Sequence, residues 1–547
     1  MGITPAETLG RDGVWLVDLT FGGQVFRFGT RAAEVADDGG DVLIYQAGLA
    51  DFDFDFSDSG IDLTIGIEIV SDIDWAALFA SGVQLERAAG VLRRWFEDQT
   101  LDRARIIVRG IVVDVEYGAV GEAFELSIES APFEQSDTLP PVTQTVGPDT
   151  WPVDRDFFDL KIEGAQYPIV IGFPGTLNDG FGAAAVPVLA VDMQITGASR
   201  RYSKILIAGH AVHASSVGLW DLTDTPASSL RPIEPPAADL LGQGMTHVNF
   251  GGAGPDFPPL ADRSWYASFD VQNGGGLFDE TRQDPLRGVG EVLRYFLRNH
   301  TRIPIDVGRM QSQDGRLNLY RVDTFINAAI NIWDWLQTTV IPLVPVISVQ
   351  TSRGLYWRFL DWDARPVDAV RDLSADDGQL DRTSSVRTLG DPIYNEITVE
   401  YAPFATSAKF RKRVIVTAQR GQLTYRPPGV IEDARIVENL RCRRSQLQFG
   451  IKPYTFKAPA VWDDATANLI ARDLANRHAL PHRRISYVGG PELESLEIGA
   501  VVTLTDSELA IPKQPALVFE VTVGDGREVE VDLVLIDSPI NNQRLTG

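Results

Sequence analysis

Six consecutive residues near the N-terminus alternate strictly between aspartate and phenylalanine, in the order Asp51-Phe52-Asp53-Phe54-Asp55-Phe56. Successive side chains of a β-strand point to opposite faces, so this order places three aromatic rings on one face and three carboxylates on the other. The segment therefore predicts a half-buried strand, and the segments around it show the same preference for sheet.

Residues 14–135 predict several strands around a single helix. Strands are expected at 14–19, 24–28, 61–69, 106–117 and 123–130, and Gly22-Gly23 between the first two predicts a hairpin. Apolar residues recur at helical spacing from Leu85 to Phe96, which predicts an amphipathic helix over 84–97. A sheet curled over one helix is a small β-barrel, which we assign to residues 1–140.

Residues 150–280 are expected to form a Gly/Pro-rich β domain. It follows a linker marked by Pro140-Pro141 and Gly147-Pro148. Short strands are expected at 167–171, 188–195 and 204–208. The stretch 226–259 holds many prolines and glycines, and we expect it to form an extended surface loop.

From residue 285 the hydrophobic period changes, and residues 285–385 are expected to form an α+β domain. Apolar residues at helical spacing from Val289 to Leu297 predict a helix over 288–299, and those from Phe325 to Leu336 predict a second helix. Strands at 346–351 and 355–360 complete the domain.

Residues 390–547 return to strands. A hairpin is expected from 396–401 and 413–418, a helix over 463–479 with Asp463 as its N-cap, and closing strands at 500–505, 516–523 and 528–536. The fold class expected for the whole chain is α+β and β-rich. It is multi-domain, with two β-barrels that each carry one helix and with inserted β and α+β domains.

The charge balance is strongly acidic. The chain has 75 Asp and Glu against 49 Lys and Arg, a net charge of −26. Such a surface repels phosphate backbones and anionic lipids, which disfavours a DNA-reading or membrane-surface role. It suits solubility, and it would also suit a wall past which DNA slides. The start of the chain lacks a secretion signal, and the apolar run 340–349 is too short to span a bilayer, so we expect a soluble protein made in the cytoplasm.

The common catalytic motifs are absent from the sequence. It contains no Gly-Lys pair of a P-loop, no Gly-x-Ser-x-Gly elbow, no His-Glu-x-x-His and no Gly-x-Gly-x-x-Gly after a strand. Cys442 is the only cysteine, which excludes an intrachain disulfide and disfavours an iron–sulfur cluster within the chain. We therefore predict no catalytic, cofactor-binding or metal-binding residue, no cofactor and no enzyme activity.

Two groups of residues resemble metal ligands, but for each group the sequence favours another interpretation. Asp51, Asp53 and Asp55 resemble a calcium loop, but the positions that need glycine and glutamate hold Phe56 and Asp62. His210 and His213 lie three residues apart, but no cysteine or acidic triad completes a site. We favour a half-buried strand for the first group and hydrogen-bonded histidines for the second.

Two further groups carry chemistry of other kinds. Asp334, Asp361 and Asp363 stand beside tryptophans, as carboxylates in sugar-cleaving sites often do, but we favour core packing for Trp333 on the apolar face of its helix, and among 75 acids some such neighbours are expected by chance. Two basic clusters stand out against the acidic background: Lys409, Arg411, Lys412 and Arg413, and Arg441, Arg443 and Arg444. Each cluster is either a solvated hairpin tip or a patch that docks an acidic partner.

Several segments, in order along the chain, resemble the tail hub proteins of long-tailed bacteriophages and gene transfer agents, also called baseplate or tail-tip hubs. These segments are Leu19-Thr20-Phe21-Gly22-Gly23, Arg109-Gly110-Ile111-Val112 leading to Tyr117-Gly118, Gly164–Pro168 running to Gly172-Phe173-Pro174-Gly175, Trp333–Leu336, and Leu496-Glu497-Ile498-Gly499-Ala500 with the strand up to Asp506.

The resemblance implies a tail-tube-like barrel duplicated within one chain. Three copies would present six barrels, a pseudo-sixfold ring that meets the tail tube or distal tail protein, while the threefold face receives a fibre or spike. The implied partners are two further copies of the chain, these neighbouring proteins, the tape-measure protein and genomic DNA in transit. The implied place is the virion tail tip, after assembly in the host cytoplasm.

The sequence departs from spike-bearing hubs because no spike barrel or β-helical repeat follows Ile536. Two alternatives stay open. One is a carbohydrate-binding or cell-wall-degrading tail-tip protein, suggested by the eleven tryptophans and the Asp–Trp neighbours. The other is the hexameric distal tail protein itself.

Overall fold

The computed structural model describes residues 13–21, 24–37, 39–56, 63–71, 73–80, 88–97, 99–101, 104–117, 123–130, 138–140, 145, 164–175, 186–187, 189–194, 201–210, 217–221, 231–233, 238–240, 246–253, 265–269, 285–301, 303–351, 354–384, 386–388, 392–404, 409–418, 433–523 and 528–536.

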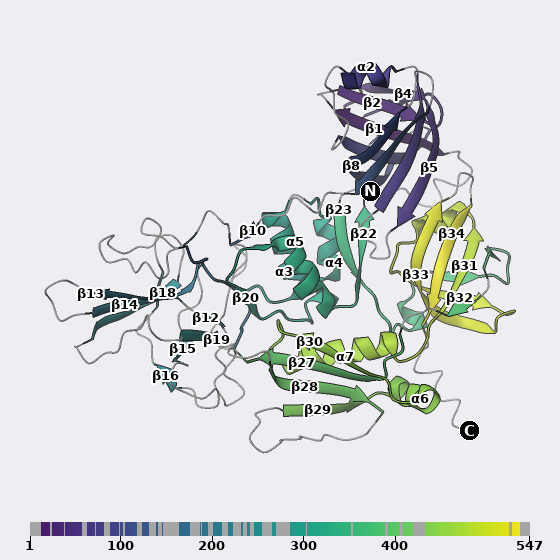
Figure 1. The fold of residues 1–547 in the computed structure, drawn as a ribbon. Helices are drawn as coiled ribbons and strands as arrows, with labels where there is room; N and C mark the ends of the chain where they lie inside the picture. Colours follow the sequence, from purple (N-terminus) through teal and green to yellow (C-terminus); the bar gives the residue numbers. More distant parts are fainter. Residues whose placement is uncertain are drawn as a thin grey trace.

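The N-terminal unit is a nine-stranded sheet in the order β3-β4-β2-β1-β7-β8-β9-β6-β5 (Figure 1). β1 and β2 pair antiparallel with Phe21 opposite Gln24, and β5 covers the Asp–Phe alternation, which confirms the predicted hairpin and strand. The strands are β1 (Gly13–Phe21), β2 (Gln24–Gly29), β3 (Ala33–Ala36), β4 (Val42–Ala47), β5 (Leu49–Phe56), β6 (Leu63–Val70), β7 (Ala89–Phe96), β8 (Arg105–Tyr117) and β9 (Ala123–Ser130).

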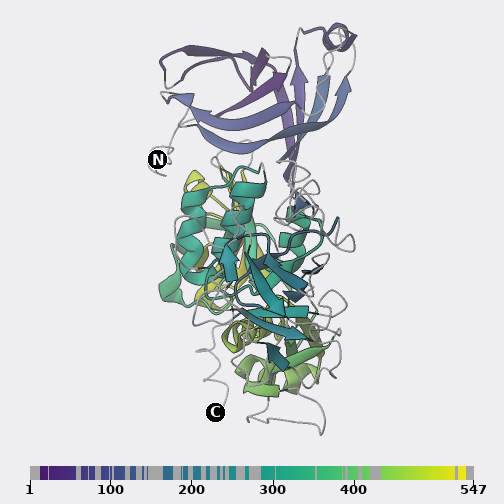
Figure 2. The same ribbon diagram turned by 90° about the vertical axis from the view of Figure 1, so that its left-hand side faces the viewer.

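Gly48 brings the two sides of this sheet together. It is the only residue between β4 and β5, which are the second and the last strand in the strand order. Its N–H donates to the carbonyl of Gly29 at 3.0 Å, and its carbonyl accepts from Val70 N–H at 2.7 Å. A Cβ at this position would lie 2.6 Å from Val70 O, so the close approach requires glycine. The sheet is therefore curled into a half-barrel (Figure 2).

The helix predicted over 84–97 is wrong, because residues 89–96 form strand β7 between β1 and β8. Gly90, Leu92 and Arg94 are buried at alternate positions, and the glycine and the arginine hide the period-two pattern from a hydrophobicity count. The described helix of this unit is instead α2 (Trp75–Ala80). Its Trp75 stacks on Phe124 with ring centroids 4.3 Å apart.

Two four-stranded sheets follow in the Gly/Pro-rich region. One has the order β12-β19-β15-β16 and the other β13-β14-β18-β17. The prediction of an extended loop over 226–259 is wrong in part, because β16, β17 and β18 lie within it. The strands are β12 (Val186–Pro187), β13 (Leu189–Gln194), β14 (Arg201–Ala208), β15 (Val217–Asp221), β16 (Arg231–Ile233), β17 (Ala238–Leu240), β18 (Thr246–Ala253) and β19 (Trp265–Phe269).

The helices of the centre pack around strand pairs. α3 (Val289–His300) confirms the first predicted helix, and its buried residues follow the predicted apolar stripe. α4 (Val307–Leu317) was not predicted, because only Met310 and Leu317 are buried in an otherwise polar sequence. The pairs are β10 (Thr138–Leu139) with β21 (Ile330–Asn331), β11 (Ile169–Ile171) with β20 (Thr324–Ile326), and β22 (Val346–Thr351) with β23 (Gly354–Phe359).

The second predicted helix begins later than expected. Residues 324–326 and 330–331 are strands, and α5 (Ile332–Trp335) starts only after Asn331, whose side chain accepts from Asp334 N–H. The helix continues as a π turn at Leu336–Val340 and a 3-10 turn at Ile341–Leu343. The apolar residues from Phe325 onward fit a helical period, but the first of them lie in β20 and β21, which pair with β11 and β10.

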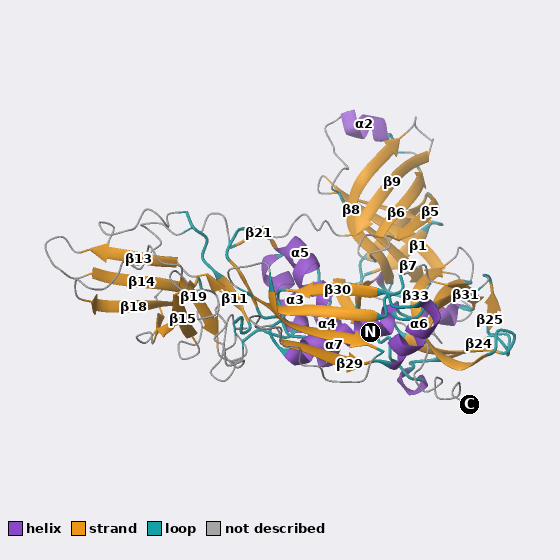
Figure 3. Ribbon diagram, turned by 60° about the horizontal axis from the view of Figure 1, so that its bottom comes forward, coloured by secondary structure: helices purple, strands orange, loops and turns teal. Residues whose placement is uncertain are grey.

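A four-stranded sheet in the order β29-β28-β27-β30 shares this centre. It contains the predicted hairpin as β27 (Glu396–Pro403) and β28 (Phe410–Thr417), with β29 (Asp433–Glu438) and β30 (Pro453–Ala458) beside it. α7 (Asp464–His478) packs against β27 and β28, and its N-cap is Asp463, as predicted. α6 (Leu440–Phe449) was not predicted (Figure 3).

The C-terminal unit is a seven-stranded sheet in the order β24-β32-β33-β34-β31-β25, with β26 beside β31. Its strands are β24 (Asp372–Ser374), β25 (Leu380–Arg382), β26 (Arg387–Thr388), β31 (Arg483–Gly489), β32 (Val501–Asp506), β33 (Ile511–Val523) and β34 (Val529–Leu535). Three of them confirm the predicted closing strands. The helix predicted to lie in this barrel, α7, instead packs on the β27–β28 sheet.

The C-terminal sheet is also curled. β24 and β25 are its two edges, yet only residues 375–379 join them. A link of that length spans at most about 20 Å, whereas six strands laid flat would separate the edges by about 24 Å. Inside the curl, the Tyr487 hydroxyl of β31 donates to Asp506 of β32 at 2.8 Å, across strands that are not neighbours in the sheet. The unit is a small barrel with its own core.

The fold class is therefore confirmed as α+β and β-rich, built from several sheets. The half-barrel and the C-terminal barrel lie on one side of the molecule, and the β12–β19 sheets extend from the other (Figure 1). One hydrophobic core runs from Leu139 to Ala479 through the centre, and the two curled sheets have separate cores.

Candidate functional site

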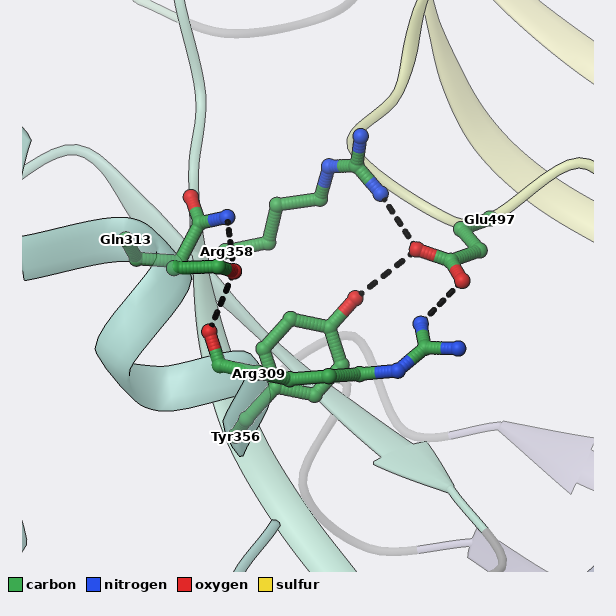
Figure 4. A pocket seen from close by; sticks show the side chains of 6 residues that line it. Arg309, Gln313, Tyr356, Arg358 and Glu497 are labelled. Carbon is green, nitrogen blue, oxygen red and sulfur yellow. Dashed lines mark hydrogen bonds and ion pairs between the residues drawn. The ribbon is translucent and has the colours of Figure 1, made fainter. Parts of the chain in front are cut away.

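A cavity of about 250 Å³ lies where α4 and β23 meet the turn before β32 (Figure 4). α4 supplies Arg309, Ser312 and Gln313, β23 supplies Tyr356 and Arg358, and the turn supplies Glu497. The cavity thus joins the α+β centre to the C-terminal barrel. Glu497 belongs to the segment Leu496–Asp506 that carries part of the sequence resemblance.

Glu497 accepts hydrogen bonds from three side chains of the centre, and we call this group the Glu497 clamp. Arg358 Nη1 donates to Oε2 at 2.6 Å, and the Tyr356 hydroxyl donates to the same oxygen at 3.1 Å. Arg309 donates to Oε1, and its guanidinium lies 5.6 Å from the centroid of the Tyr356 ring. Both carboxylate oxygens are therefore occupied by groups of the α+β centre.

The charges of the clamp stabilise its ionised form. Burial alone would raise the pKa of Glu497, but the hydrogen bond and charge of Arg309 and the charge of Arg358 outweigh burial and lower it. Burial and the nearby Glu497 carboxylate raise the pKa of Tyr356, so its hydroxyl remains a donor at neutral pH. Glu497 therefore stays ionised and Tyr356 stays protonated at neutral pH.

Gly499, two residues after Glu497, sets the position of the clamp. Gly499 has φ +77°, a left-handed conformation that favours glycine, and its N–H donates to Val518 O at 2.7 Å. A Cβ there would lie 3.1 Å from Arg358 Cδ. The turn therefore brings Glu497 onto Arg358 without space for a side chain between them.

The side chains of the cavity join the α+β centre to the C-terminal barrel. The charged side chains that line it are paired with one another, and Ser312 Oγ donates to the carbonyl of Arg309 at 2.6 Å instead of facing a base. Among the described residues, no group of three His, Cys, Asp or Glu side chains could hold a metal ion.

A second junction surrounds Asp323, whose side chain is fully buried. Arg287 donates to it through Nε at 2.7 Å and Nη2 at 2.9 Å, and Phe173 N–H donates to Oδ1 at 2.8 Å. The backbone N–H of Asp323 donates to Ala460 O at 2.7 Å. Asp323 thus connects the segment before α7 through its backbone, and the start of the α3 region and the Gly172–Gly175 segment of the resemblance through its carboxylate.

Gly172 makes this junction possible. Its φ is +65°, and a Cβ would lie 2.4 Å from both Asp323 Oδ1 and Val322 O. Its N–H donates to Leu286 O at 3.1 Å. The sequence offered no local signal for the pairing of Asp323 with Arg287 and Phe173, because the partners lie 36 and 150 residues away.

Asp473 of α7 is a buried carboxylate that accepts a hydrogen bond from the Tyr320 hydroxyl. Burial raises its pKa to about 6, despite that hydrogen bond and the nearby Arg472. Because the folded pKa lies above the ordinary value of 3.8, the protonated form suits the fold. The contribution of Asp473 to stability is therefore full below about pH 4 and is lost as the pH rises through 6.

We expect Asp473→Asn to stabilise the protein at pH 8 by about 2–3 kcal/mol and to leave it nearly unchanged at pH 4. The amide keeps an acceptor for Tyr320 and removes the buried charge. Thermal unfolding followed across this pH range measures the effect. The exposed control Asp41→Asn should shift both ends equally, and parallel curves for Asp473→Asn and wild type would contradict the prediction.

Of the residues considered as metal ligands, the structure describes the side chain of His210 alone. His210 Nε2 accepts from Val170 N–H at 2.9 Å, so the interpretation of a hydrogen-bonded histidine is confirmed for this residue. His213 and the side chains of Asp51, Asp53 and Asp55 lie outside the described residues, although the backbone of the three aspartates forms strand β5.

The three aspartates beside tryptophans also serve separate local contacts. Asp334 is exposed in the first turn of α5, while Asp361 pairs with Arg316 at 3.1 Å and Asp363 with Arg441 at 3.5 Å. Trp333 is buried in the central core, as predicted, and Trp362 is buried as well.

The basic clusters are divided by burial. Arg411 lies inside β28 with its guanidinium 4.7 Å from the Phe404 ring centroid, and Arg441 donates to the carbonyls of Trp362 and Asn476, each at 2.9 Å. Burial raises the pKa of the Cys442 thiol to about 12, so this cysteine is not a thiolate nucleophile at neutral pH. Arg443 and Arg444 remain exposed on α6.

Within the described residues, no helix is long and apolar enough to cross a membrane.

Neither a family model nor a curated protein matches the chain. Three solved structures are similar in fold at low identity. A tail protein from Neisseria meningitidis MC58 has 10% identity and a TM-score of 0.35, with 96% of each chain covered. A chain of the virion of a native gene transfer agent particle has 13% identity and a TM-score of 0.40, covering 73% of this chain and 90% of that one. The 43 kDa tail protein of prophage MuSo2 from Shewanella oneidensis has 8% identity and a TM-score of 0.32, covering 95% and 98%. At these TM-scores we take no functional conclusion from the likenesses.

Proposed function

We propose that the chain is a structural virion protein, a trimeric tail hub that connects the tail tube or distal tail ring to a tip fibre or spike. The observation that carries the proposal is the presence of two curled β-sheets in one chain, each with its own core, beside a shared centre. Three copies would offer six such units, which is what a sixfold tube needs from a threefold partner. The ordered sequence resemblance supports the same assignment.

In this role the protein acts without a catalytic residue or cofactor, at the tail tip, and closes the tube until the tape-measure protein and DNA leave. The side chains of the Glu497 cavity pair across the centre and the C-terminal barrel, which suits a protein that holds these two units in a fixed relative position. The net charge of −26 suits a lumen wall that must not hold DNA. We keep the four ranges 1–140, 150–280, 285–385 and 390–547 as proposed domains, with β24 and β25 of the third range joining the last barrel.

The mass of the purified chain in solution tests the proposal. Light scattering over a concentration series should give three chains of 60.0 kDa, about 180 kDa. A hexamer would favour the distal tail ring instead. A chain that stays monomeric at high concentration, also in the presence of its tube partner, would count against the hub.

A further inference from the structure

Helix α6 presents an unusual outer face. Leu440, Arg443, Arg444 and Leu447 recur at helical spacing and are exposed, and exposed Ile451 follows just after the helix ends at Phe449. The opposite side anchors the helix, since Arg441, Cys442 and Ser445 are buried. We call the exposed set, together with exposed Lys452, the basic face.

The basic face combines cations with apolar side chains. Leu447 is 85% exposed, Ile451 61% and Leu440 59%. Residues 440–452 contain four Lys and Arg and no acidic residue, in a chain where acids outnumber bases. Large apolar side chains and arginines are the composition of the buried part of a protein interface.

An acidic counterpart lies on the C-terminal barrel. Residues 372–381 hold four aspartates, all exposed, and no Lys or Arg, and we call them the acidic segment. Two apolar side chains lie just before it, Val367 at 79% and Val370 at 65% exposed. The acidic segment therefore complements the basic face in both charge and apolar character.

We propose that the basic face of one copy binds the acidic segment of the next copy in the trimer. This inference rests on the proposed function and assigns the surface that joins the copies. Chains with a net charge of −26 repel one another, so association requires a surface where the local charge is reversed. The two surfaces differ and belong to separate elements. Each copy therefore contacts one neighbour through its basic face and the other neighbour through its acidic segment, and such a heterologous contact can close a ring.

The test reverses charge on each surface and measures the mass by light scattering over a concentration series. Arg443→Glu with Arg444→Glu should raise the concentration at which the trimer dissociates by at least about 100-fold, since like charges then face each other. Asp377→Lys with Asp381→Lys should do the same from the other side. The control Arg31→Glu with Arg298→Glu makes the same change in net charge at exposed positions elsewhere and should leave the trimer intact.

Combining the two swaps gives the sharpest result. A chain that carries all four substitutions should form trimers again, because every contact is once more between opposite charges. An equimolar mixture of the two double variants should not form trimers. Its contacts require the variants to alternate, and a ring of three cannot alternate.

The outcomes separate the two proposals. If the wild type is trimeric and the Arg443→Glu, Arg444→Glu variant dissociates at the same concentration as the control, the proposed interface is wrong and the hub proposal stands. A monomeric wild type would overturn both. Should that variant fail to fold, the variant on the acidic segment and the fourfold variant still decide, since the former leaves α6 unchanged.

Discussion

Asp323→Ala is expected to destabilise the centre of the protein by about 3–5 kcal/mol, because it leaves a buried guanidinium without its carboxylate. Arg287 is only 11% exposed in its side chain and makes two hydrogen bonds to Asp323. The change also removes the acceptor of Phe173 N–H. Urea unfolding followed by tryptophan fluorescence reports it, since Trp333, Trp335 and Trp357 belong to the same core.

The exposed ion pair of Glu97 with Arg31, at 2.6 Å, provides the matched control. Both side chains are at least half exposed, so water replaces the contact when it is broken. Glu97→Ala should leave the unfolding midpoint unchanged. If Asp323→Ala shifted the midpoint no more than Glu97→Ala, the buried junction would not stabilise the fold.

Gly354→Ala should cost about 3 kcal/mol or more, from backbone strain and overpacking together. Gly354 has φ +128°, which non-glycine residues rarely adopt, and a Cβ would lie 2.3 Å from Pro304 O. That carbonyl is backbone and accepts from Leu355 N–H at 2.8 Å, so it cannot turn aside. The substitution would push the segment before α4 away from β23 and with it Arg309 from Tyr356.

Gly378→Ala separates strain from crowding. Gly378 also has positive φ, +76°, but nothing lies within 4 Å of its Cβ position. Its substitution should cost about 1 kcal/mol from the left-handed backbone alone. Thermal unfolding of both variants measures the difference, and equal shifts would show that the contact with Pro304 yields easily.

The strands could be predicted where one face is buried and the other is wet, because burial then leaves a period of two in the sequence. β27 follows this rule, since Ile397, Val399 and Tyr401 are buried and the residues between them are half-buried. β7 does not, since Gly90 is buried beneath Ile128 and Arg94 is buried beside Trp15, with its guanidinium 5.4 Å from that ring centroid. Neither residue counts as apolar, so the remaining apolar residues happened to fit a helix.

The helices missed by the sequence are those whose outer faces carry little pattern. α4 buries only two side chains, and α6 buries an arginine and a serine while exposing two leucines. The junctions around Asp323 and Glu497 were missed for another reason. Their partners come from distant parts of the chain, and one aspartate or glutamate among 75 acids has no local mark. Only the glycines nearby, Gly172 and Gly499, signal that backbones approach closely there.

The continuous core from Leu139 to Ala479 also bears on how the chain is made. During synthesis the half-barrel is complete once β9 has left the ribosome at Ser130, since all its strands precede that residue. The centre cannot close until α7 has emerged, because Ile470, Ala471 and Ala475 fill it. The apolar side chains from Val170 onward therefore stay exposed until more than half of the remaining chain has been synthesised. During this interval incomplete copies can aggregate.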